Sequence, residues 1–183
     1  MALQAKEFRD ALGLFATGVA VIVTEADGRV HAMTANAVSS LSLDPMLVLF
    51  CPGKKARFSE LLPRATHYSI NFLRDDQQVL STYFAGSWKE PAPPPFRFVA
   101  SGPFRRPEGA LSALLCVRHQ EVLDGGDHWL VMARVEEAHR GIEPYRPLVF
   151  FRGQYRGIDL NAGTPAPDLA AVADEPAQMY YHS

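Results

Sequence analysis

The pattern of apolar and polar residues along the chain predicts short strands interrupted by a few short helices. A first helix over residues 6–15 is indicated by apolar side chains at helical spacing, namely Phe8, Ala11, Leu12 and Phe15. The β-branched run Val19–Thr24 is typical of a strand, and Val30–Thr34 forms its return strand. Asp27-Gly28 between them is a tight-turn signal, because glycine tolerates the positive φ that such a turn needs.

Strands and helices continue to alternate through the middle of the chain. The apolar run Leu47–Cys51 predicts a strand that is buried on both faces. The expected elements that follow are a short helix over 58–65, a strand over His67–Leu73, and a helix capped by Asp75 that runs to about Phe84. The segment Glu90–Pro95 contains four prolines, so it predicts a loop.

The last part of the chain predicts a long hairpin and a final strand. Strands over Ala113–Val122 and His128–Glu137 are separated by a five-residue loop, Leu123–Asp127. Pro147–Tyr155 predicts the last strand. Beyond residue 159 the apolar pattern is lost, so we expect one domain over 1–159 and a tail over 160–183 that is loose or docks on a partner subunit.

These elements favour a mainly β fold. About seven closely spaced strands joined by hairpins, without a repeated βαβ unit, predict an antiparallel barrel rather than a doubly wound sheet.

Composition and charge exclude several classes of protein. A net charge of −2 over 183 residues argues against a nucleic-acid binder. Cys51 and Cys116 form no CxxC pair, so no metal site is expected and both should be buried thiols in a reducing compartment. Without a signal-peptide pattern or an apolar run long enough to span a bilayer, we expect a cytoplasmic protein that is not bound to a membrane. Rossmann, P-loop and HExxH motifs are absent from the sequence.

Two segments have the composition of a ligand cradle. Met33–Ser40 (MTANAVSS) places hydroxyls and an amide among small alanines, which would let a flat ring or a phosphate approach the backbone. It could equally be a serine-rich turn that satisfies itself. Cys51–Arg57 (CPGKKAR) carries three cations in a loop before a helix, which suits a phosphate, although a solvated basic turn has the same composition.

A third segment, Gly126-Asp127-His128, places a histidine after a tight loop and beside a carboxylate. The histidine could serve a ligand, or it could hydrogen-bond Asp127 and hold the hairpin.

Taken together, these segments resemble a known family. From Phe8 to Ile158 the chain is similar to the flavin reductase family, whose members adopt the FMN-binding split barrel, a Greek-key antiparallel β-barrel. The stretches that carry the resemblance are FRDALGLFATG (8–18), MTANAVSSLSLDPMLVLF (33–50), NFL (71–73), GDH (126–128) and PLVFFRGQYR (147–156).

The resemblance implies a homodimer with flavin near the subunit interface, and it assigns roles to particular residues. His128 would lie near the nicotinamide as the candidate catalytic group. The residues expected to bind flavin or the dinucleotide are Met33, Thr34, Ala35, Asn36, Ala37, Ser39, Ser40, Cys51, Lys54, Lys55, Ala56, Arg57, Phe84, Ala85, Gly86, Lys89, Arg152, Gly153, Gln154 and Tyr155.

The chain departs from the family pattern in a few places. Ala37 stands where a small polar residue is usual, and Ala56 stands where serine or threonine is common, so each removes one possible hydroxyl contact. The proline run after Lys89 lies where the rim of the active site is expected.

The resemblance implies a reductase that passes hydride from NADH or NADPH to FMN, or to FAD, and supplies reduced flavin to a separate monooxygenase. Two alternatives stay open. One is an enzyme that keeps its flavin tightly bound and reduces another acceptor. The other is a non-catalytic protein that stores or senses flavin, which would have no use for a nicotinamide site.

Overall fold

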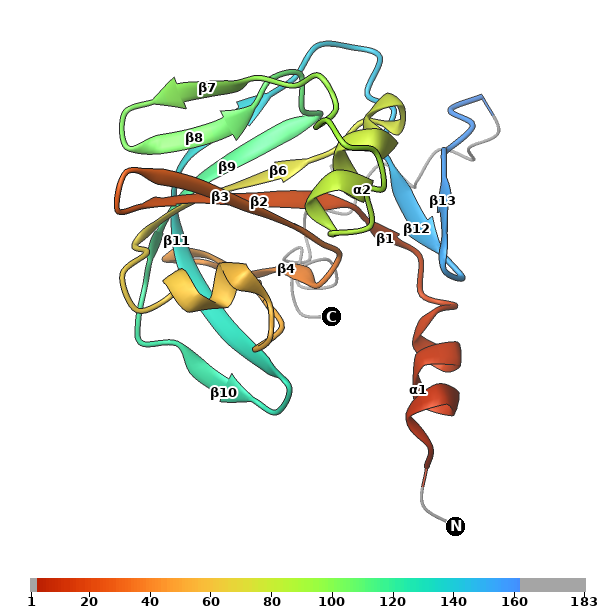
Figure 1. The fold of residues 1–183 in the computed structure, drawn as a ribbon, viewed down its shortest axis with the longest axis horizontal. Coiled ribbons are helices and arrows are strands. Elements are labelled where there is room, and N and C mark those ends of the chain that lie inside the picture. Colours follow the sequence, from red (N-terminus) through yellow and green to blue (C-terminus); the bar gives the residue numbers. More distant parts are fainter. Residues whose placement is uncertain (1–2, 162–183) are drawn as a thin grey trace, which may run out of the picture.

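The computed structural model describes residues 3–161, and strands dominate this part of the chain (Figure 1). Its helices are α1 (Ala5–Leu12) and α2 (Gln78–Phe84), with short 3-10 segments at Arg57–Leu61 and Asp75–Gln77. The strands are β1 (Thr17–Gly18), β2 (Ala20–Ala26), β3 (Arg29–Ala35), β4 (Val38–Leu43), β5 (Met46–Phe50), β6 (His67–Phe72), β7 (Phe98–Ser101), β8 (Phe104–Pro107), β9 (Ser112–Arg118), β10 (Leu123–Gly125), β11 (His128–Arg140), β12 (Val149–Phe151) and β13 (Gln154–Arg156).

One antiparallel sheet forms the body of the molecule. Its strand order is β3-β2-β6-β9-β11-β5-β4, and β10 pairs with the start of β11. The two edge strands, β3 and β4, follow one another in the chain with only Asn36 and Ala37 between them. The sheet therefore curls until its edges meet at this corner, and no ladder joins β3 to β4 within residues 3–161. This open, curled sheet confirms the predicted mainly β split-barrel fold.

Two apolar cores lie on the two faces of the sheet. The concave side of the curl holds the larger one, centred on Phe50 and Tyr68, whose ring centroids are 5.2 Å apart in a T-shaped contact. The smaller core joins Val21 and Val23 on the other face of β2 to Leu80 of α2. Strand β2 is consequently buried on both faces, and it ties α2 to the sheet.

The Asp27-Gly28 turn is confirmed. The two residues have φ values of 52° and 69° and join Ala26 to Arg29 as a two-residue hairpin loop. This turn fixes the register of β3, which places Thr34 and Ala35 at the corner where the sheet edges meet.

Several predicted elements are wrong in extent. The strand expected to be buried on both faces is β5, and only Val48 and Phe50 are buried, because no other element covers the outer face of the β4–β5 hairpin in the described chain. The predicted strand 147–155 is two strands, since Arg152 and Gly153 turn the chain with φ values of 50° and 73°. The expected five-residue loop 123–127 is only a two-residue turn at Gly126-Asp127.

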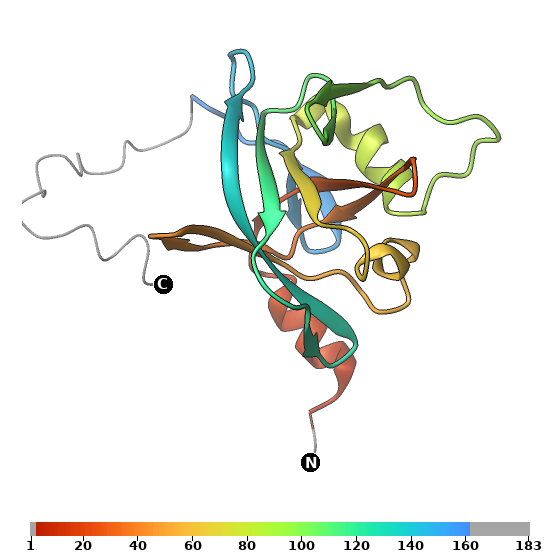
Figure 2. The ribbon, with the colours of Figure 1, turned by 90° about the vertical axis from the view of Figure 1, so that its left-hand side faces the viewer.

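Other differences are local. Helix α1 ends at Leu12 rather than Phe15, and Arg74 instead of Asp75 stands at the N-cap of the segment before α2. Strands β4, β7 and β8 were not predicted, while the proline segment 90–95 is a loop as expected. That loop projects from the body beside α2 (Figure 2).

The predicted tail 160–183 lies outside the described residues beyond Asn161. In the described part, the longest helix has eight residues, so no helix there is long and apolar enough to cross a membrane.

Candidate functional site

Hydrogen bonds between side chains and backbone fasten three distant elements at the corner where the sheet edges meet. The Thr34 hydroxyl of β3 donates to the Ser81 carbonyl of α2 at 2.6 Å. The Ser81 hydroxyl, which is fully buried, lies 2.8 Å from the Tyr155 hydroxyl of β13. The predicted segments 33–40, 84–89 and 152–155 are therefore neighbours, and Ser81 is the residue that joins them.

The backbone beyond Thr34 is open to solvent. Asn36 and Ala37 are exposed at the corner, and Ser39 and Ser40 are exposed on the free edge strand β4. An edge strand presents backbone groups that no neighbouring strand uses. Polar ligand atoms can therefore reach backbone and hydroxyl groups here without displacing a core contact.

Three members of the predicted set face the protein rather than solvent. Met33 is 8% exposed and belongs to the larger core, and Ala35 packs against that core. Phe84 is half-buried in an aromatic cluster, with its ring centroid 5.2 Å from that of Phe96. These side chains position the backbone of their segments.

The loop 51–57 docks on the tip of the long hairpin β10–β11. The Trp129 N–H donates to the Pro52 carbonyl, and the Lys54 N–H donates to the Asp127 carbonyl, both at 2.9 Å. The Cys51 N–H donates to the Ala37 carbonyl at 3.2 Å, which links this loop to the corner. The structure thus brings all three predicted segments, 33–40, 51–57 and 126–128, into one continuous surface.

Lys54 is held in place by the hairpin. Its Nζ lies 2.5 Å from the Asp124 carboxylate and 4.5 Å from the centre of the Trp129 ring. Lys55 and Arg57 are exposed and form no ion pair within residues 3–161. Of the three cations in the loop, these two are available to an external anion. Ala56 lies between them and is half-buried.

His128 makes the contact that its alternative interpretation predicted. Its Nδ1 lies 2.7 Å from the Asp127 carboxylate, and its side chain is 49% exposed. A Cβ added at Gly53 would lie 3.7 Å from His128 Nε2, so the backbone of the docked loop runs beside the ring. The ring is fixed on one side by Asp127 and faces solvent and the 51–57 loop on the other.

Three pKa values are shifted in this region, two by hydrogen bonds to charged partners at the tip and one by burial. The hydrogen bond from Lys54, followed by that from the Gly126 N–H, lowers the pKa of Asp124. The hydrogen bond with His128 lowers the pKa of Asp127. Burial raises the pKa of the half-buried Cys51 thiol, which is therefore neutral at physiological pH.

The 152–155 segment contacts the corner through Tyr155, but it does not reach His128. The Arg152 N–H donates to the Gly13 carbonyl at 2.8 Å, which holds the β12–β13 turn against the end of α1. Arg152, Gly153 and Gln154 are exposed, and no hydrogen bond or ion pair in the described structure joins this segment to His128. The β10–β11 tip and the β12–β13 hairpin lie on different parts of the molecule in Figure 1.

At the end of α2, Ala85, Gly86 and Lys89 are exposed. Gly86 has a φ of 73° where the helix stops, and the Trp88 indole N–H donates to the Ala92 carbonyl at 2.8 Å, which closes the base of the proline loop. This segment follows directly on the residues that hold Thr34.

Sequence reasoning missed Ser81, Asp124 and Trp129. Ser81 had a weak signal, since it is a polar residue on the apolar side of a predicted helix. Asp124 and Trp129 had none, because their role depends on a loop 70 residues away in sequence. No group of three or more histidine, cysteine, aspartate or glutamate side chains that could hold a metal ion occurs in residues 3–161.

Comparison with known proteins gives a consistent result. Residues 12–159 match the family model of the "Flavin reductase like domain". The chain is 36% identical over 172 residues to "Flavin-dependent monooxygenase, reductase subunit HsaB" of Rhodococcus jostii (strain RHA1), which covers 91% of this chain and 84% of that protein. It is 39% identical over 158 residues to an "NADH-dependent flavin reductase" of a Rhodococcus species, covering 83% and 85% of the two chains.

Solved structures agree. The flavin reductase PheA2 has a TM-score of 0.79 at 39% identity, over 86% of this chain and 99% of that chain. The NADH:FAD oxidoreductase SgcE6 of Streptomyces globisporus, solved with NAD and FAD fragments, has a TM-score of 0.76 at 28% identity, over 89% of this chain and 99% of that chain.

The Lys54 contact predicts how the Asp124 carboxyl titrates. Because its pKa is lowered in the folded protein, the ion pair contributes fully above the pKa of the unfolded chain and is lost as the pH falls through the folded pKa. In Lys54→Gln, the pKa of Asp124 should rise toward its ordinary value. Carboxyl NMR titration measures this shift. Asp127 is the internal control and should shift far less, since His128 is its main partner. An Asp124 pKa that is the same in the wild type and the variant would contradict the assignment.

Proposed function

The chain belongs to the flavin reductase like family, and from this premise we propose how its described surface performs the reaction. The activity is that of an NAD(P)H:flavin oxidoreductase, with a flavin and NADH as cofactors. One observation supports our placement of the site most strongly: the corner at Asn36-Ala37 is the point where the 51–57 loop, α2 and both sheet edges converge.

The residues present at the corner fit a flavin. Exposed backbone at Asn36 and Ala37 offers N–H and C=O groups to the polar edge of a flat ring, and Ser39 and Ser40 offer hydroxyls to its side chain. When bound, the flavin supplies the redox chemistry by accepting hydride from the nicotinamide. The protein holds the two rings in contact and places N–H groups where negative charge develops.

We place the flavin phosphate at Lys55 and Arg57. Both cations are exposed and without an ion pair in the described chain, whereas Lys54 is already held by Asp124. Of the three cations predicted to bind the phosphate, we therefore assign this role to Lys55 and Arg57. Lys54 instead anchors the loop to the hairpin.

The phosphate assignment predicts a selective loss of affinity. Each charge-assisted hydrogen bond contributes about 1.5–3 kcal/mol, so Lys55→Ala/Arg57→Ala should weaken FMN binding by at least about tenfold. Riboflavin, which lacks the phosphate, should bind this variant as it binds the wild type. Lys54→Ala is the matched control: it loosens the loop without removing a direct phosphate contact, so it should weaken FMN binding less than the double variant does. Equal losses of FMN and riboflavin in the double variant would contradict the assignment. Fluorescence titration measures the wild type and both variants.

We propose that His128 positions the nicotinamide. Asp127 fixes one ring nitrogen, which leaves Nε2 directed toward the 51–57 loop and available to a ligand. Hydride transfer needs no proton from the protein, so the role is orientation.

Stopped-flow reduction of the flavin-loaded protein by NADH tests both the function and His128. The wild-type flavin should bleach, and a flavin that stays oxidised would contradict the proposed function. In His128→Ala the rate should fall about tenfold, equivalent to about 1.4 kcal/mol of lost transition-state stabilisation, with flavin affinity and melting temperature unchanged. Asp127→Asn separates the alternatives. If His128 only holds the hairpin, both variants should lower the melting temperature and leave the reduction rate at low temperature normal.

We also propose a homodimer. The apolar side of α1 and the turn after it lie uncovered in the single chain, with Phe8 53%, Leu12 56% and Phe15 73% exposed. Figure 1 shows α1 standing away from the sheet. A second copy that covers this side would also lie beside the 152–155 turn, which is bonded to Gly13.

The dimer can be tested by light scattering of the flavin-loaded protein. The wild type should have twice the mass of the chain at micromolar concentration, and Phe8→Glu/Phe15→Glu should be monomeric. Val30→Glu is the control, since this exposed residue lies at the far end of β3 and should leave the dimer intact. A monomeric wild type that retains its flavin would overturn the proposal.

The reduced flavin is proposed to pass to a separate monooxygenase. The names of similar proteins support this, since several are reductase subunits or components of two-component monooxygenases, among them the "4-hydroxyphenylacetate 3-monooxygenase, reductase component" of Thermus thermophilus. We place the protein in the cytoplasm, where reduced nicotinamide is available, and we keep residues 1–159 as the catalytic domain.

A further inference from the structure

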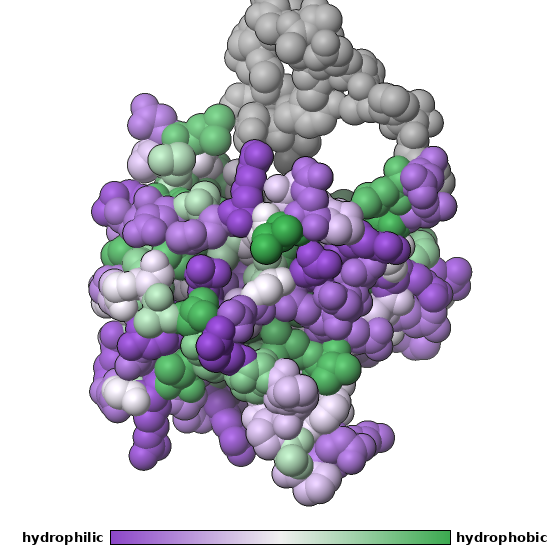
Figure 3. Space-filling model, turned by 90° about the horizontal axis from the view of Figure 1, so that it is seen from above, coloured by the Kyte–Doolittle hydropathy of each residue, from purple (hydrophilic) through white to green (hydrophobic). Residues whose placement is uncertain are grey.

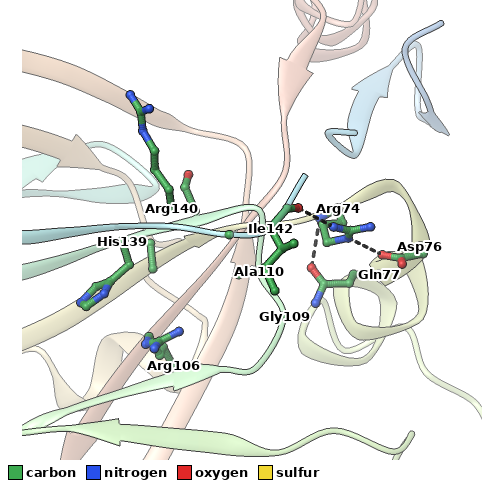
Figure 4. Close-up of a pocket in the computed structure, with 12 residues that line it drawn as sticks. Arg74, Asp76, Gln77, Arg106, Gly109, Ala110, His139, Arg140 and Ile142 are labelled. Atoms are coloured by element: carbon green, nitrogen blue, oxygen red, sulfur yellow. Dashed lines mark hydrogen bonds and ion pairs between the residues drawn. The ribbon is translucent and has the colours of Figure 1, made fainter. Parts of the chain in front are cut away.

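A pocket of about 550 Å³ lies outside the flavin corner (Figure 4). It is enclosed by the segment before α2, the end of β8, the start of β9 and the end of β11. Ser112 of its wall is three strands away from Ala35, through Phe72 and Ala20, which corresponds to roughly 14 Å at the usual strand spacing. None of the residues assigned above to flavin or nicotinamide lines this pocket.

The pocket is rich in positive charge. Arg74, Arg106 and Arg140 line it together with His139, and Asp76 is the only carboxylate in its wall. Arg74 is partly neutralised, with its Nε 3.4 Å from Asp76 and its Nη1 donating to the Ile142 carbonyl at 3.1 Å. Arg106 forms no ion pair within residues 3–161, and the Arg140 side chain points away from it on the other side of β11 (Figure 4).

Two buried nitrogens in this wall have no hydrogen-bond acceptor. Arg106 Nε and His139 Nε2 are shielded from solvent and have no hydrogen-bond partner in the described structure. His139 Nε2 lies 3.3 Å from the Glu137 carboxylate but makes no aligned hydrogen bond to it. Since buried N–H groups are normally satisfied, an acceptor is missing beside Arg106.

A β-bulge accounts for the position of His139. The register of β11 against β9 shifts between Val135 and Glu137, which leaves Glu136 unpaired. Val131 and Ala133 before the bulge face the larger core, and without the extra residue His139 would face that side too. The bulge instead turns His139 to the face that carries β8 and Arg106 (Figure 4).

The remaining wall carries no charge, and part of it is apolar. Ala110, Ala113 and Ile142 contribute no charge, and Ile142 is 84% exposed at the rim. Gly141 packs so closely that an added Cβ would lie 2.5 Å from the Ala110 carbonyl oxygen. The face of the molecule seen from above carries hydrophilic areas interspersed with hydrophobic ones (Figure 3). The volume is within the usual range for small-molecule sites.

We propose that this pocket binds a small organic oxyanion, a carboxylate or phosphate ester with an apolar body. The oxyanion accepts hydrogen bonds from Arg106 Nε and His139 Nε2, the two nitrogens of this wall that have no acceptor. The apolar body lies against Ala110, Ala113 and Ile142. The site does not depend on the flavin reductase assignment.

Isothermal titration of FMN-saturated protein tests this, because saturation blocks phosphate binding at the flavin corner. The probes are benzoate and phenyl phosphate at constant ionic strength, with benzyl alcohol as the uncharged control. Benzoate, phenyl phosphate or both should bind saturably with a Kd of about 1 mM or tighter, and the stronger probe identifies the class of oxyanion. Benzyl alcohol should not bind.

Variants locate the binding. Arg106→Gln should weaken anion binding at least tenfold, and His139→Phe, which removes the second unpartnered nitrogen, supplies a second test if the first variant folds poorly. Arg29→Gln removes an exposed arginine far from the pocket and should bind as the wild type does. All three should reduce flavin at the wild-type rate. No saturable binding to the wild type, or equal affinity in His139→Phe and the wild type, would overturn the proposal.

Discussion

The central constraint in this protein is that the two edges of one antiparallel sheet are only two residues apart in the chain. With Asn36 and Ala37 as the whole connection, β3 and β4 cannot lie at opposite ends of a flat sheet, so the sheet must curl around its apolar side chains. The curl creates the larger core on the inside and leaves β2 free to bury its other face under α2. The corner at Asn36 and Ala37, where we propose that flavin binds, therefore results from the closing of the sheet. It lies where the two edge strands meet without pairing.

A second set of interactions holds the elements around this corner in place while its backbone stays accessible to solvent. Thr34, Ser81 and Tyr155 hold α2 and β13 on one side of it, and the backbone bonds of Pro52 and Lys54 hold the long hairpin on the other. The Lys54–Asp124 pair at the tip is exposed and carries little stability by itself. Its value is geometric, because it fixes the loop that presents Lys55 and Arg57.

The sequence predicted the turns and strands whose conformation depends mainly on residues close together in the chain. Asp27-Gly28 was recognisable because its turn needs two residues at positive φ, and β6 was clear from its apolar pattern. PLVFFRGQY was mistaken for one strand because arginine rarely adopts the φ of 50° found at Arg152. The three ligand segments were found singly and joined only by family resemblance. Their physical link, from Ala37 to Cys51 and from Pro52 to Trp129, depends on contacts between residues far apart in the chain. The pocket lined by Arg74, Arg106 and Arg140 could not be recognised in the sequence, since these arginines lie in three separate parts of the chain.

The bulge at Glu136 divides β11 into two parts. The part before the bulge forms the hairpin tip with β10, and the part after it lines the cationic pocket. Removing that one residue would exchange inside and outside for everything from Glu137 to Arg140 while leaving His128 in register with β10. A single-codon deletion at this point would thus turn His139 away from the pocket without changing any residue that we propose to bind flavin. In this chain, one extra residue in β11 decides which face of the sheet the side chains of residues 137–140 occupy.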